Sequence, residues 1–535
     1  MGSPNTSLME QATLALKPHL QSLDSFTADE NGTLPVAITL TTLAATIVCL
    51  VLTRLVFHPL AGVPGPRLAG LTGWYEFYHD VIRNGQYVKH IEEMHAKYNS
   101  PIIRIGPNQV HVNDPVVYKK VFAIGSPYLK PKFFYTSVGL PEAIGAILDV
   151  KKHHARRSVL GPRFSPKAIA SYTGSLVNQV LACTEIMAAR SRRGGVVEMP
   201  RFTRALTVDV ISEFTFGRSF GLVTDTGPEE PELLRDLSLF TKQFHVCKHI
   251  PIYRWALGQI PASISRKMMP GYYQLREKAT ASVTALVAER DAGKRVPAKP
   301  DEGTVLDLLL TPRQKHNHDI PGPDVLVDEG CAFIVGGSDT TGYTMEGATY
   351  LLLSHPECLK RLRDELDAAM PAIRDYDLQT VLELPFLSAV IKETLRLYTA
   401  TPPPFPRVVP ASGLDVGPHF LPGGTIISLS IYLIHHNPSL FSEPKSFKPE
   451  RWLGEAGKQL EQYYVPFSRG TRSCIGMNLA YHEMYTFLAI LFSRFEMEVV
   501  GTCEGDMEWY DNLFARRVGP VKIRLVSDRW SGEVL

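Results

Sequence analysis

The sequence has no paired cysteines. Its seven cysteines are scattered without the short spacings of a zinc site or a disulfide framework: Cys49, Cys183, Cys247, Cys331, Cys358, Cys474 and Cys503. It also lacks an excess of either charge, since the formal net charge is +2, which gives no support for binding nucleic acid. No internal repeat and no flavin- or nicotinamide-binding signature is present. The folded part therefore suits a reducing compartment, and the electrons for any redox reaction must come from a separate protein.

One long apolar segment is present near the N-terminus. Val36 to Thr53 contains no charged residue, and the apolar run continues past Arg54 to Phe57. About 20 apolar residues span a bilayer as a helix. A cleaved signal peptide would begin closer to Met1 with a basic region, and a buried core helix is the other alternative. The sequence predicts a transmembrane anchor over residues 34–57.

The anchor stands between a polar tail and a proline-rich hinge. Residues 1–33 form the tail, which carries the glycosylation sequons Asn5-Thr-Ser and Asn31-Gly-Thr. Residues 58–66 contain three prolines and two glycines, so they predict a stiff, extended break before a catalytic domain at 67–535.

A cysteine loop near the C-terminus carries the clearest chemistry. Phe467-Ser-Arg-Gly-Thr-Arg-Ser-Cys-Ile-Gly476 leads directly into a helical pattern from Met477 to Phe495. The helix dipole favours a thiolate at Cys474, Gly470 and Gly476 allow close approach of a flat ligand, and Arg472 can meet an anionic group. With Phe467 covering the sulfur, this is the pattern of an axial thiolate on haem iron; the alternative is a small buried hydrophobe.

The motif Phe-x-x-Gly-x-Arg-x-Cys-x-Gly resembles the haem-binding signature of the cytochrome P-450 family. That resemblance implies haem b, held by the Cys474 thiolate. It also implies that Arg157, in Lys152 to Ser165, meets a haem propionate, with His153 where the family often has Trp. An exposed basic helix face is the other interpretation of Arg157. Arg407, in Thr401-Pro-Pro-Pro-Phe-Pro-Arg, is the second propionate candidate, and Phe405 is expected to face substrate.

A long helix is predicted from Val325 to Ser354, with Gly336-Gly-Ser-Asp-Thr-Thr341 in its middle. Each glycine costs a helix about 1 kcal/mol relative to alanine, so Gly336 and Gly337 need a reason. Room for dioxygen and substrate beside the haem is one, and a packing notch between helices is the other. The segment resembles the family's oxygen-activation motif, in which Asp339 and Thr340 would relay protons.

Glu393 and Arg396 lie three residues apart, so they share one face of a predicted helix. By itself this pattern is common on surface helices. With Phe447-Lys-Pro-Glu-Arg-Trp452 downstream it resembles the family's structural triad, in which Arg451 folds onto the Glu393–Arg396 pair.

The remaining pattern is mainly helical. Residues 168–290 show amphipathic helical spacing, with turn signals at Thr226-Gly-Pro and from Gly258 to Pro261, and Phe240 to Leu257 fits either a membrane-facing lip or a surface helix pair. Strands are expected at Ile102-Ile-Arg-Ile, at Gln109-Val-His-Val and over Glu508 to Leu525, with a hairpin around Gly423-Gly424. The fold class is thus mainly α with a small β-rich lobe, and the resemblance implies the cytochrome P-450 fold behind a transmembrane helix.

The resemblance implies a monooxygenase that uses dioxygen and electrons from an NADPH-dependent reductase to oxidise a lipophilic small molecule. The details are most similar to fungal microsomal, trichodiene oxygenase-like members, with a single-pass anchor in the endoplasmic reticulum and a cytosolic catalytic domain. Two alternatives are a haem-thiolate isomerase or dehydratase that uses no dioxygen, and a non-enzymatic haem protein. The sequence does not identify the substrate.

Overall fold

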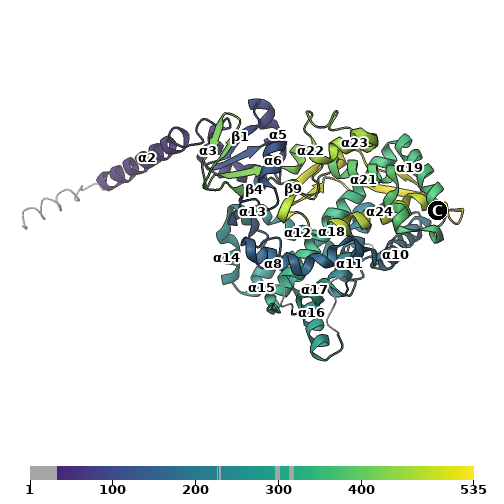
Figure 1. Cartoon of the computed structure of the whole chain (residues 1–535). Helices are drawn as coiled ribbons and strands as arrows, with labels where there is room; N and C mark the ends of the chain where they lie inside the picture. The colour runs from purple at the N-terminus through teal and green to yellow at the C-terminus, as the bar shows by residue number, and fades with distance from the viewer. Residues whose placement is uncertain (1–32, 226, 228–229, 296–301, 313–318) are drawn as a thin grey trace, which may run out of the picture.

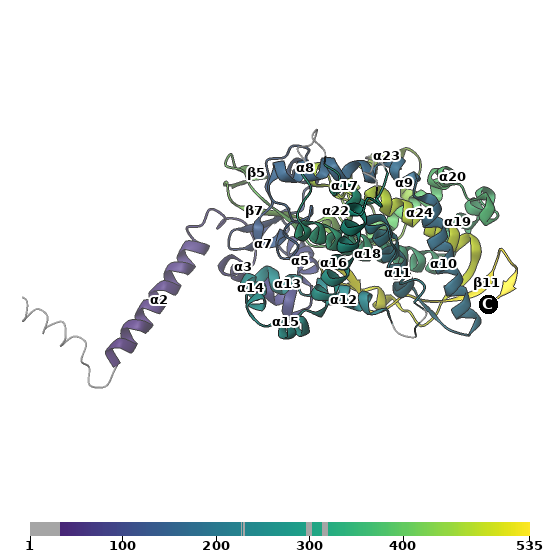
Figure 2. The same ribbon diagram turned by 90° about the horizontal axis from the view of Figure 1, so that it is seen from below.

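The computed structural model of the chain describes residues 33–225, 227, 230–295, 302–312 and 319–535. The sequons at Asn5 and Asn31 and most of the Thr226-Gly-Pro turn lie outside these residues. Helix α2 (Thr33–Leu55) projects from the globular body like a handle, as Figures 1 and 2 both show. It is the one described helix long and apolar enough to cross a membrane, and none of the apolar window Ile38–Leu55 is buried against the protein.

Helices make up most of the body. In chain order they are α3 (Arg67–Leu71), α4 (Trp74–Phe77), α5 (Tyr87–Tyr98), α6 (Pro115–Val121), α7 (Lys132–Tyr135), α8 (Val150–Leu160), α9 (Pro166–Ala170), α10 (Thr173–Arg192), α11 (Met199–Phe216), α12 (Glu232–Lys242), α13 (Phe244–His249), α14 (Pro251–Gln259), α15 (Ala262–Met268), α16 (Pro270–Asp291), α17 (Val305–Leu309), α18 (Pro323–Ser354), α19 (Pro356–Ala369), α20 (Leu378–Glu383), α21 (Pro385–Leu397), α22 (Ile431–His435), α23 (Gly454–Leu460) and α24 (Met477–Arg494). A π-helical turn, Tyr78–Ile82, follows α4.

The strands form four small sheets. They are β1 (Ile102–Gly106), β2 (Gln109–Val112), β3 (Val197–Glu198), β4 (Phe405–Val408), β5 (Leu414–Val416), β6 (His419–Leu421), β7 (Ile426–Leu429), β8 (Phe495–Val499), β9 (Trp509–Asn512), β10 (Phe514–Arg517), β11 (Lys522–Asp528) and β12 (Glu533–Val534). The largest connected order is β1-β2-β7-β4, in which only β2 and β7 run parallel. A second sheet joins β3, β8 and β12 to β11, while β5–β6 and β9–β10 are separate hairpins.

Two local predictions are wrong. The hairpin turn lies at Gly417, which adopts φ +56 between β5 and β6, and not at Gly423-Gly424. Gly423 instead passes against Ala411, where a Cβ would lie 2.8 Å from a backbone carbon. The hinge at 58–66 is a series of turns rather than an extended segment, with Ala61 N–H donating to the His58 carbonyl at 2.8 Å and Leu60 fully buried.

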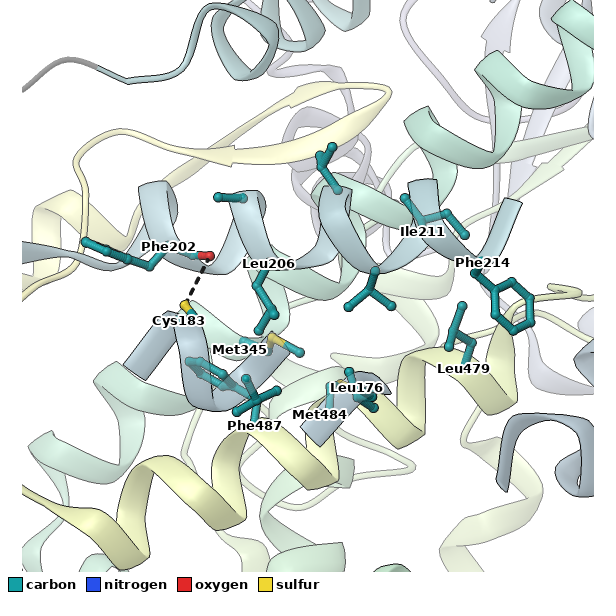
Figure 3. Close-up of a cluster of buried hydrophobic side chains, with 14 of the residues drawn as sticks. Leu176, Cys183, Phe202, Leu206, Ile211, Phe214, Met345, Leu479, Met484 and Phe487 are labelled. Atoms are coloured by element: carbon teal, nitrogen blue, oxygen red, sulfur yellow. Dashed lines mark hydrogen bonds between the residues drawn. The ribbon is translucent and has the colours of Figure 1, made fainter. Parts of the chain in front are cut away.

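The core lies where four long helices meet. Helix α11 packs along α18, and α10 and α24 close the group from the other side. Figure 3 shows side chains of α10, α11 and α24, among them Leu176, Leu206 and Phe487, meeting Met345 of α18. The start of α18 has Pro323 at its first turn and Asp324 beside the helix N-terminus, both of which suit that position. The packed core fixes α18 and α24 relative to each other, and the site lies between them.

Candidate functional site

Cys474 lies just before α24 and its side chain lines a cavity of about 390 Å³. Its backbone N–H donates to the Phe467 carbonyl at 2.9 Å, which closes the loop predicted from the sequence. Burial raises the pKa of the Cys474 thiol, while the Gly476 N–H and the nearby Arg157 charge act in the opposite direction. The thiol therefore faces the cavity with two groups beside it that favour the thiolate.

The two glycines of the loop act differently. Gly470 has φ +71, and a Cβ there would lie 2.2 Å from the Phe122 carbonyl oxygen, so no other residue fits without a shift. Gly476 has φ −84, and a Cβ there would reach only ordinary contact with the Cys474 sulfur, at 3.9 Å. Phe467 lines the cavity and packs on Tyr481, with 5.1 Å between the ring centroids.

Helix α18 forms one wall of the cavity and carries both the expected acid and the expected alcohol. Thr340 lines the cavity, and its hydroxyl donates to the Gly336 carbonyl at 2.8 Å. A Cβ on Gly336 would meet no atom within 4 Å, as expected for a residue facing open space. A Cβ on Gly337 would lie 2.7 Å from the Ile211 side chain of α11. Each of the two explanations offered by the sequence thus applies to one glycine: Gly336 leaves open space in the cavity, and Gly337 allows α18 to pack closely against α11.

Asp339 is not part of the cavity wall. Its carboxylate accepts from Arg204 Nε of α11 at 2.7 Å and from Arg516 of β10 at 2.5 Å. Burial opposes ionisation, but the two guanidinium groups hold the pKa of Asp339 below its usual value. Asp339 and Thr340 are adjacent in sequence, yet the carboxylate is ionised and bound away from the cavity.

Five basic side chains gather at one end of the cavity: Lys130, His153, Arg157, Arg407 and Arg472. The pKa of Lys130 is held well below its usual value by burial and then by Arg407 and Arg472. Burial and the Arg472, Lys130 and Arg157 charges lower the pKa of His153 to about 3, and its buried Nδ1 has no hydrogen-bond partner. Burial, followed by Arg407, lowers the pKa of Arg472 to about 10.

The three arginines of this group lack anionic partners among the described residues. Arg157 donates to the Ser473 carbonyl at 2.6 Å, Arg472 to the Ile147 carbonyl at 2.7 Å, and Arg407 to the Tyr135 hydroxyl. Neutral oxygens do not balance several buried charges. A flat cofactor with carboxylates at one edge and a thiolate-binding metal at its centre supplies the missing charge, so the residues present fit haem.

The predicted triad is assembled. Arg396 is fully buried and binds the Glu393 carboxylate with two nitrogens, at 2.8 and 2.9 Å. Arg451 Nε reaches the same carboxylate at 3.0 Å, and Trp452 Nε1 reaches it at 2.8 Å. Arg396 also donates to the carbonyl of His435 at 2.9 Å. The group joins α21 to the segment before the cysteine loop and does not reach the cavity.

Among the residues of the cavity wall that sequence reasoning missed, three bear on its chemistry: Lys130, Thr399 and Glu483. No motif surrounds Lys130. Glu483 lies two turns along α24 from Gly476, on the face that also carries Ala480 in the cavity wall, so helical spacing from the loop could have found it. Burial raises the pKa of Glu483 well above its usual value, and one of its oxygens has no partner. Phe405 lines the cavity, as its sequence context indicated, and so does Phe514.

Comparison with known proteins gives a consistent result. The family described as Cytochrome P450 matches residues 66–523. The chain is 58% identical over 441 residues to the cytochrome P450 monooxygenase penB of Penicillium thymicola, covering 82% of this chain and 99% of that protein. It is 60% identical over 427 residues to the cytochrome P450 monooxygenase asqL of Emericella nidulans, covering 79% and 88%.

The fold is also similar to a solved structure, described as retinoic acid bound cyanobacterial CYP120A1. The TM-score is 0.70 at 20% sequence identity, covering 87% of this chain and 99% of that one. At this identity the likeness concerns the fold alone.

Proposed function

Because the chain belongs to the cytochrome P450 family and is a haem-thiolate monooxygenase, we propose that it oxidises a lipophilic small molecule of fungal secondary metabolism, such as a terpenoid, polyketide or alkaloid. The observation that carries this proposal is the position of Cys474 in a mainly apolar cavity that Thr340 also lines. The aromatic rings of Phe333, Phe405 and Phe514 line the same space and suit an apolar substrate.

Each candidate residue has a defined part in this proposal. Cys474 would hold the haem iron, and Arg157, Arg407 and Arg472 would hold the propionates, with Lys130 beside them. Bound haem supplies the activation of dioxygen and the transfer of one oxygen atom to a C–H bond or a double bond. Phe467 would shield the sulfur from water, and the open space at Gly336 would leave room for dioxygen and substrate.

Proton supply would depend on Asp339 and Thr340. The Thr340 hydroxyl faces the cavity and can pass a proton onward, since a hydroxyl both donates and accepts. Asp339 would take up a proton from outside and deliver it only after rotating away from Arg516, because two arginines hold it ionised. Arg204 and Arg516 therefore control when the acid is available.

Thr340 also distinguishes the monooxygenase from the rival that uses no dioxygen. We expect Thr340→Ala to divert most of the consumed NADPH to hydrogen peroxide, with turnover to product falling by roughly 100-fold, in the range of a lost proton-transfer group. Thr340→Ser, which keeps the hydroxyl, should retain most of the coupling. Full turnover and coupling in the alanine variant would instead favour an isomerase or dehydratase.

The partner would be a separate membrane-bound, NADPH-dependent reductase, and the site the cytosolic face of the endoplasmic reticulum. Helix α2 supports an anchor over residues 34–57, after a luminal tail at 1–33 and before the hinge at 58–66 and the catalytic domain at 67–535. Exposed Trp74, Ile82, Ile252 and Trp255 lie on α4, the turn after it and α14. These apolar side chains favour a membrane-facing lip for the Phe240 to Leu257 region over a surface helix pair.

The test is the reduced, carbon-monoxide difference spectrum of the full-length protein, with Cys474→Ala as its partner. A thiolate-type Soret band that disappears in the variant is the expected result. An imidazole-type band, or folded protein without haem, would overturn the proposed function.

A further inference from the structure

Among the described residues that line the cavity, two carry a buried side-chain oxygen without a hydrogen-bond partner: Thr399 and Glu483. Glu483 lies on α24, the helix that starts beside Cys474, and burial raises the pKa of its carboxyl well above the usual value. Thr399 follows the end of α21, is only 6% exposed, and keeps its hydroxyl at every pH that the protein meets. An unpaired hydroxyl in an apolar wall costs free energy, and a ligand that forms a hydrogen bond with it would remove that cost.

Two other hydroxyls of the wall are already satisfied by their own helix. Thr340 donates to the Gly336 carbonyl at 2.8 Å, and Thr344 donates to the Thr340 carbonyl at 3.0 Å. Such bonds leave these side chains little need of a partner in the cavity. Thr399 lies beyond the last turn of α21 and has no carbonyl of that kind within reach.

The backbone around Thr399 is held on both sides. Tyr398 N–H donates to the Thr394 carbonyl at 2.8 Å, which closes the end of α21. Ala515 N–H of β10 donates to the Ala400 carbonyl at 2.9 Å, and the Ser430 hydroxyl donates to the Pro402 carbonyl at 3.2 Å. The hydroxyl is therefore presented at a fixed place, which is what a selective contact requires.

The aromatic rings and the charged side chains of the cavity wall indicate what other chemistry the ligand has. Phe333, Phe405 and Phe514 come from three different elements and line the cavity with Thr399. The basic residues Lys130, Arg407 and Arg472 also line it, but they are the group assigned above to the propionates. The space left for substrate thus offers aromatic surface and, besides the Glu483 carboxyl, one unsatisfied hydroxyl, that of Thr399.

We propose that Thr399 is a specificity-determining residue, whose hydroxyl donates a hydrogen bond to a carbonyl or hydroxyl oxygen on an otherwise apolar ring compound. This inference rests on the proposed function and narrows its substrate class. A site built to bond one polar group discriminates strongly against the analogue that lacks it, because the protein group is then left unpaired. A purely hydrocarbon substrate is disfavoured on that ground.

The test uses two bicyclic probes of equal size, 1-tetralone with a carbonyl and tetralin without one. Each is titrated into the ferric holoenzyme, full chain, and the dissociation constant is taken from the shift of the Soret band. The proteins are wild type, Thr399→Val, which has the same shape without the hydroxyl, and Thr399→Ser, which keeps it. Thr344→Val is the matched control, since it removes a cavity hydroxyl that is bonded internally.

We expect Thr399→Val to reduce the preference for 1-tetralone over tetralin about tenfold, the effect of one hydrogen bond. Thr399→Ser and Thr344→Val should keep the wild-type ratio within about twofold. Thr399→Ala replaces the valine variant if that protein does not retain haem. An intact carbon-monoxide band with unchanged ratios, or with no binding of either probe, overturns this inference alone. Absence of the thiolate band from wild type overturns the proposed function itself.

Discussion

Single residues decide how closely the cysteine loop approaches its neighbours. Gly470 passes so near the Phe122 carbonyl that a Cβ has no room, while Gly454 has a similar left-handed backbone, φ +64, in open space. The pair separates two costs that are usually measured together: the strain of the left-handed conformation and the steric clash.

We expect Gly470→Ala to lower the free energy of unfolding by roughly 3 kcal/mol, from backbone strain plus overpacking, and to reduce haem retention. Gly454→Ala should cost about 1 kcal/mol and leave haem content unchanged, because only the strain applies. Thermal melting and the haem-to-protein ratio of both variants give the comparison. Equal losses would show that the Phe122 contact has no effect.

Glu483 gives a second prediction at this scale. Its pKa is raised in the folded protein, so its contribution to stability is complete below the pKa of the unfolded chain, near 4.5, and is lost as pH rises toward the folded value. Glu483→Gln removes this pH-dependent loss of stability, because the amide does not ionise. The melting temperature of the variant should therefore exceed that of wild type by a margin that grows from pH 5 to pH 8.

The control for this experiment is Glu357→Gln, on the exposed face of α19, which should leave the pH dependence as it is in wild type. A margin between Glu483→Gln and wild type that stays constant with pH would mean that the buried carboxyl does not titrate as described.

At the scale of elements, a buried charge cluster joins α13 to the turn after α4. The Asp80 carboxylate accepts from Lys248 at 2.5 Å and from His249 at 2.9 Å, and His245 lies 3.4 Å away. His245 Nε2 also lies 2.8 Å from the Asp511 carbonyl oxygen of β9. Phe244, beside His245, packs on Phe134 next to the cavity. The cluster therefore holds α13 against α4 and the turn after it.

This cluster makes stability depend on pH in the alkaline range. Burial lowers the pKa of His245, but the Asp80 and Asp511 carboxylates raise it to about 10. Since the folded value is raised, the stabilisation is complete below pH 6.5 and is lost as pH rises through about 10. We expect His245→Gln to melt several degrees below wild type at pH 7, with the difference closing by pH 10.5 or so. His419→Gln, on β6, serves as the control, and a difference independent of pH would contradict this account.

Local sequence signals decided which elements could be located from the sequence. Helix α18 was predicted within two residues at either end, because Pro323 and Asp324 mark its start. The β5–β6 hairpin was misplaced because two glycine sites, Gly417 and Gly423, both carry turn signals, and only packing against Ala411 tells them apart. The cysteine loop was found because its residues are contiguous.

Residues brought together from distant segments could not be found in the same way. Lys130 and Arg407 lie 277 positions apart by their numbering, 407 minus 130, and no local pattern links them. The orientation of Asp339 depends on Arg204 and Arg516, which come from α11 and β10. The sequence indicated the acid beside the alcohol, but not that two arginines hold the acid away from the cavity.

At the scale of the whole molecule, α2 and the globular body are nearly independent. No residue of the apolar window of α2 is buried, and the last residues of the helix, half-buried, make the contact with the body. Arg104 donates to the Arg54 carbonyl at 2.8 Å, and Arg54 donates to the Leu71 carbonyl.

Removal of residues 1–50 should therefore leave the carbon-monoxide spectrum and the melting temperature unchanged, while reducing sedimentation with membranes. Removal of residues 1–58 takes Arg54 away and should lower the melting temperature, because the Arg104 guanidinium loses one of its two carbonyl partners and keeps only that of Pro107. Loss of the haem band on removal of residues 1–50 would mean that α2 supports the catalytic fold directly.

The basic side chains at one end of the cavity should affect how long the protein survives in the cell. Lys130, Arg157, Arg407 and Arg472 repel one another until carboxylates arrive, so the newly made chain is least stable before it receives its cofactor. Quality-control proteases act on such incompletely stabilised chains. We therefore expect the half-life of the protein to shorten in cells starved of haem, and Lys130→Met to lessen that effect. The abundance of this enzyme would then follow cofactor supply without any change in its transcription.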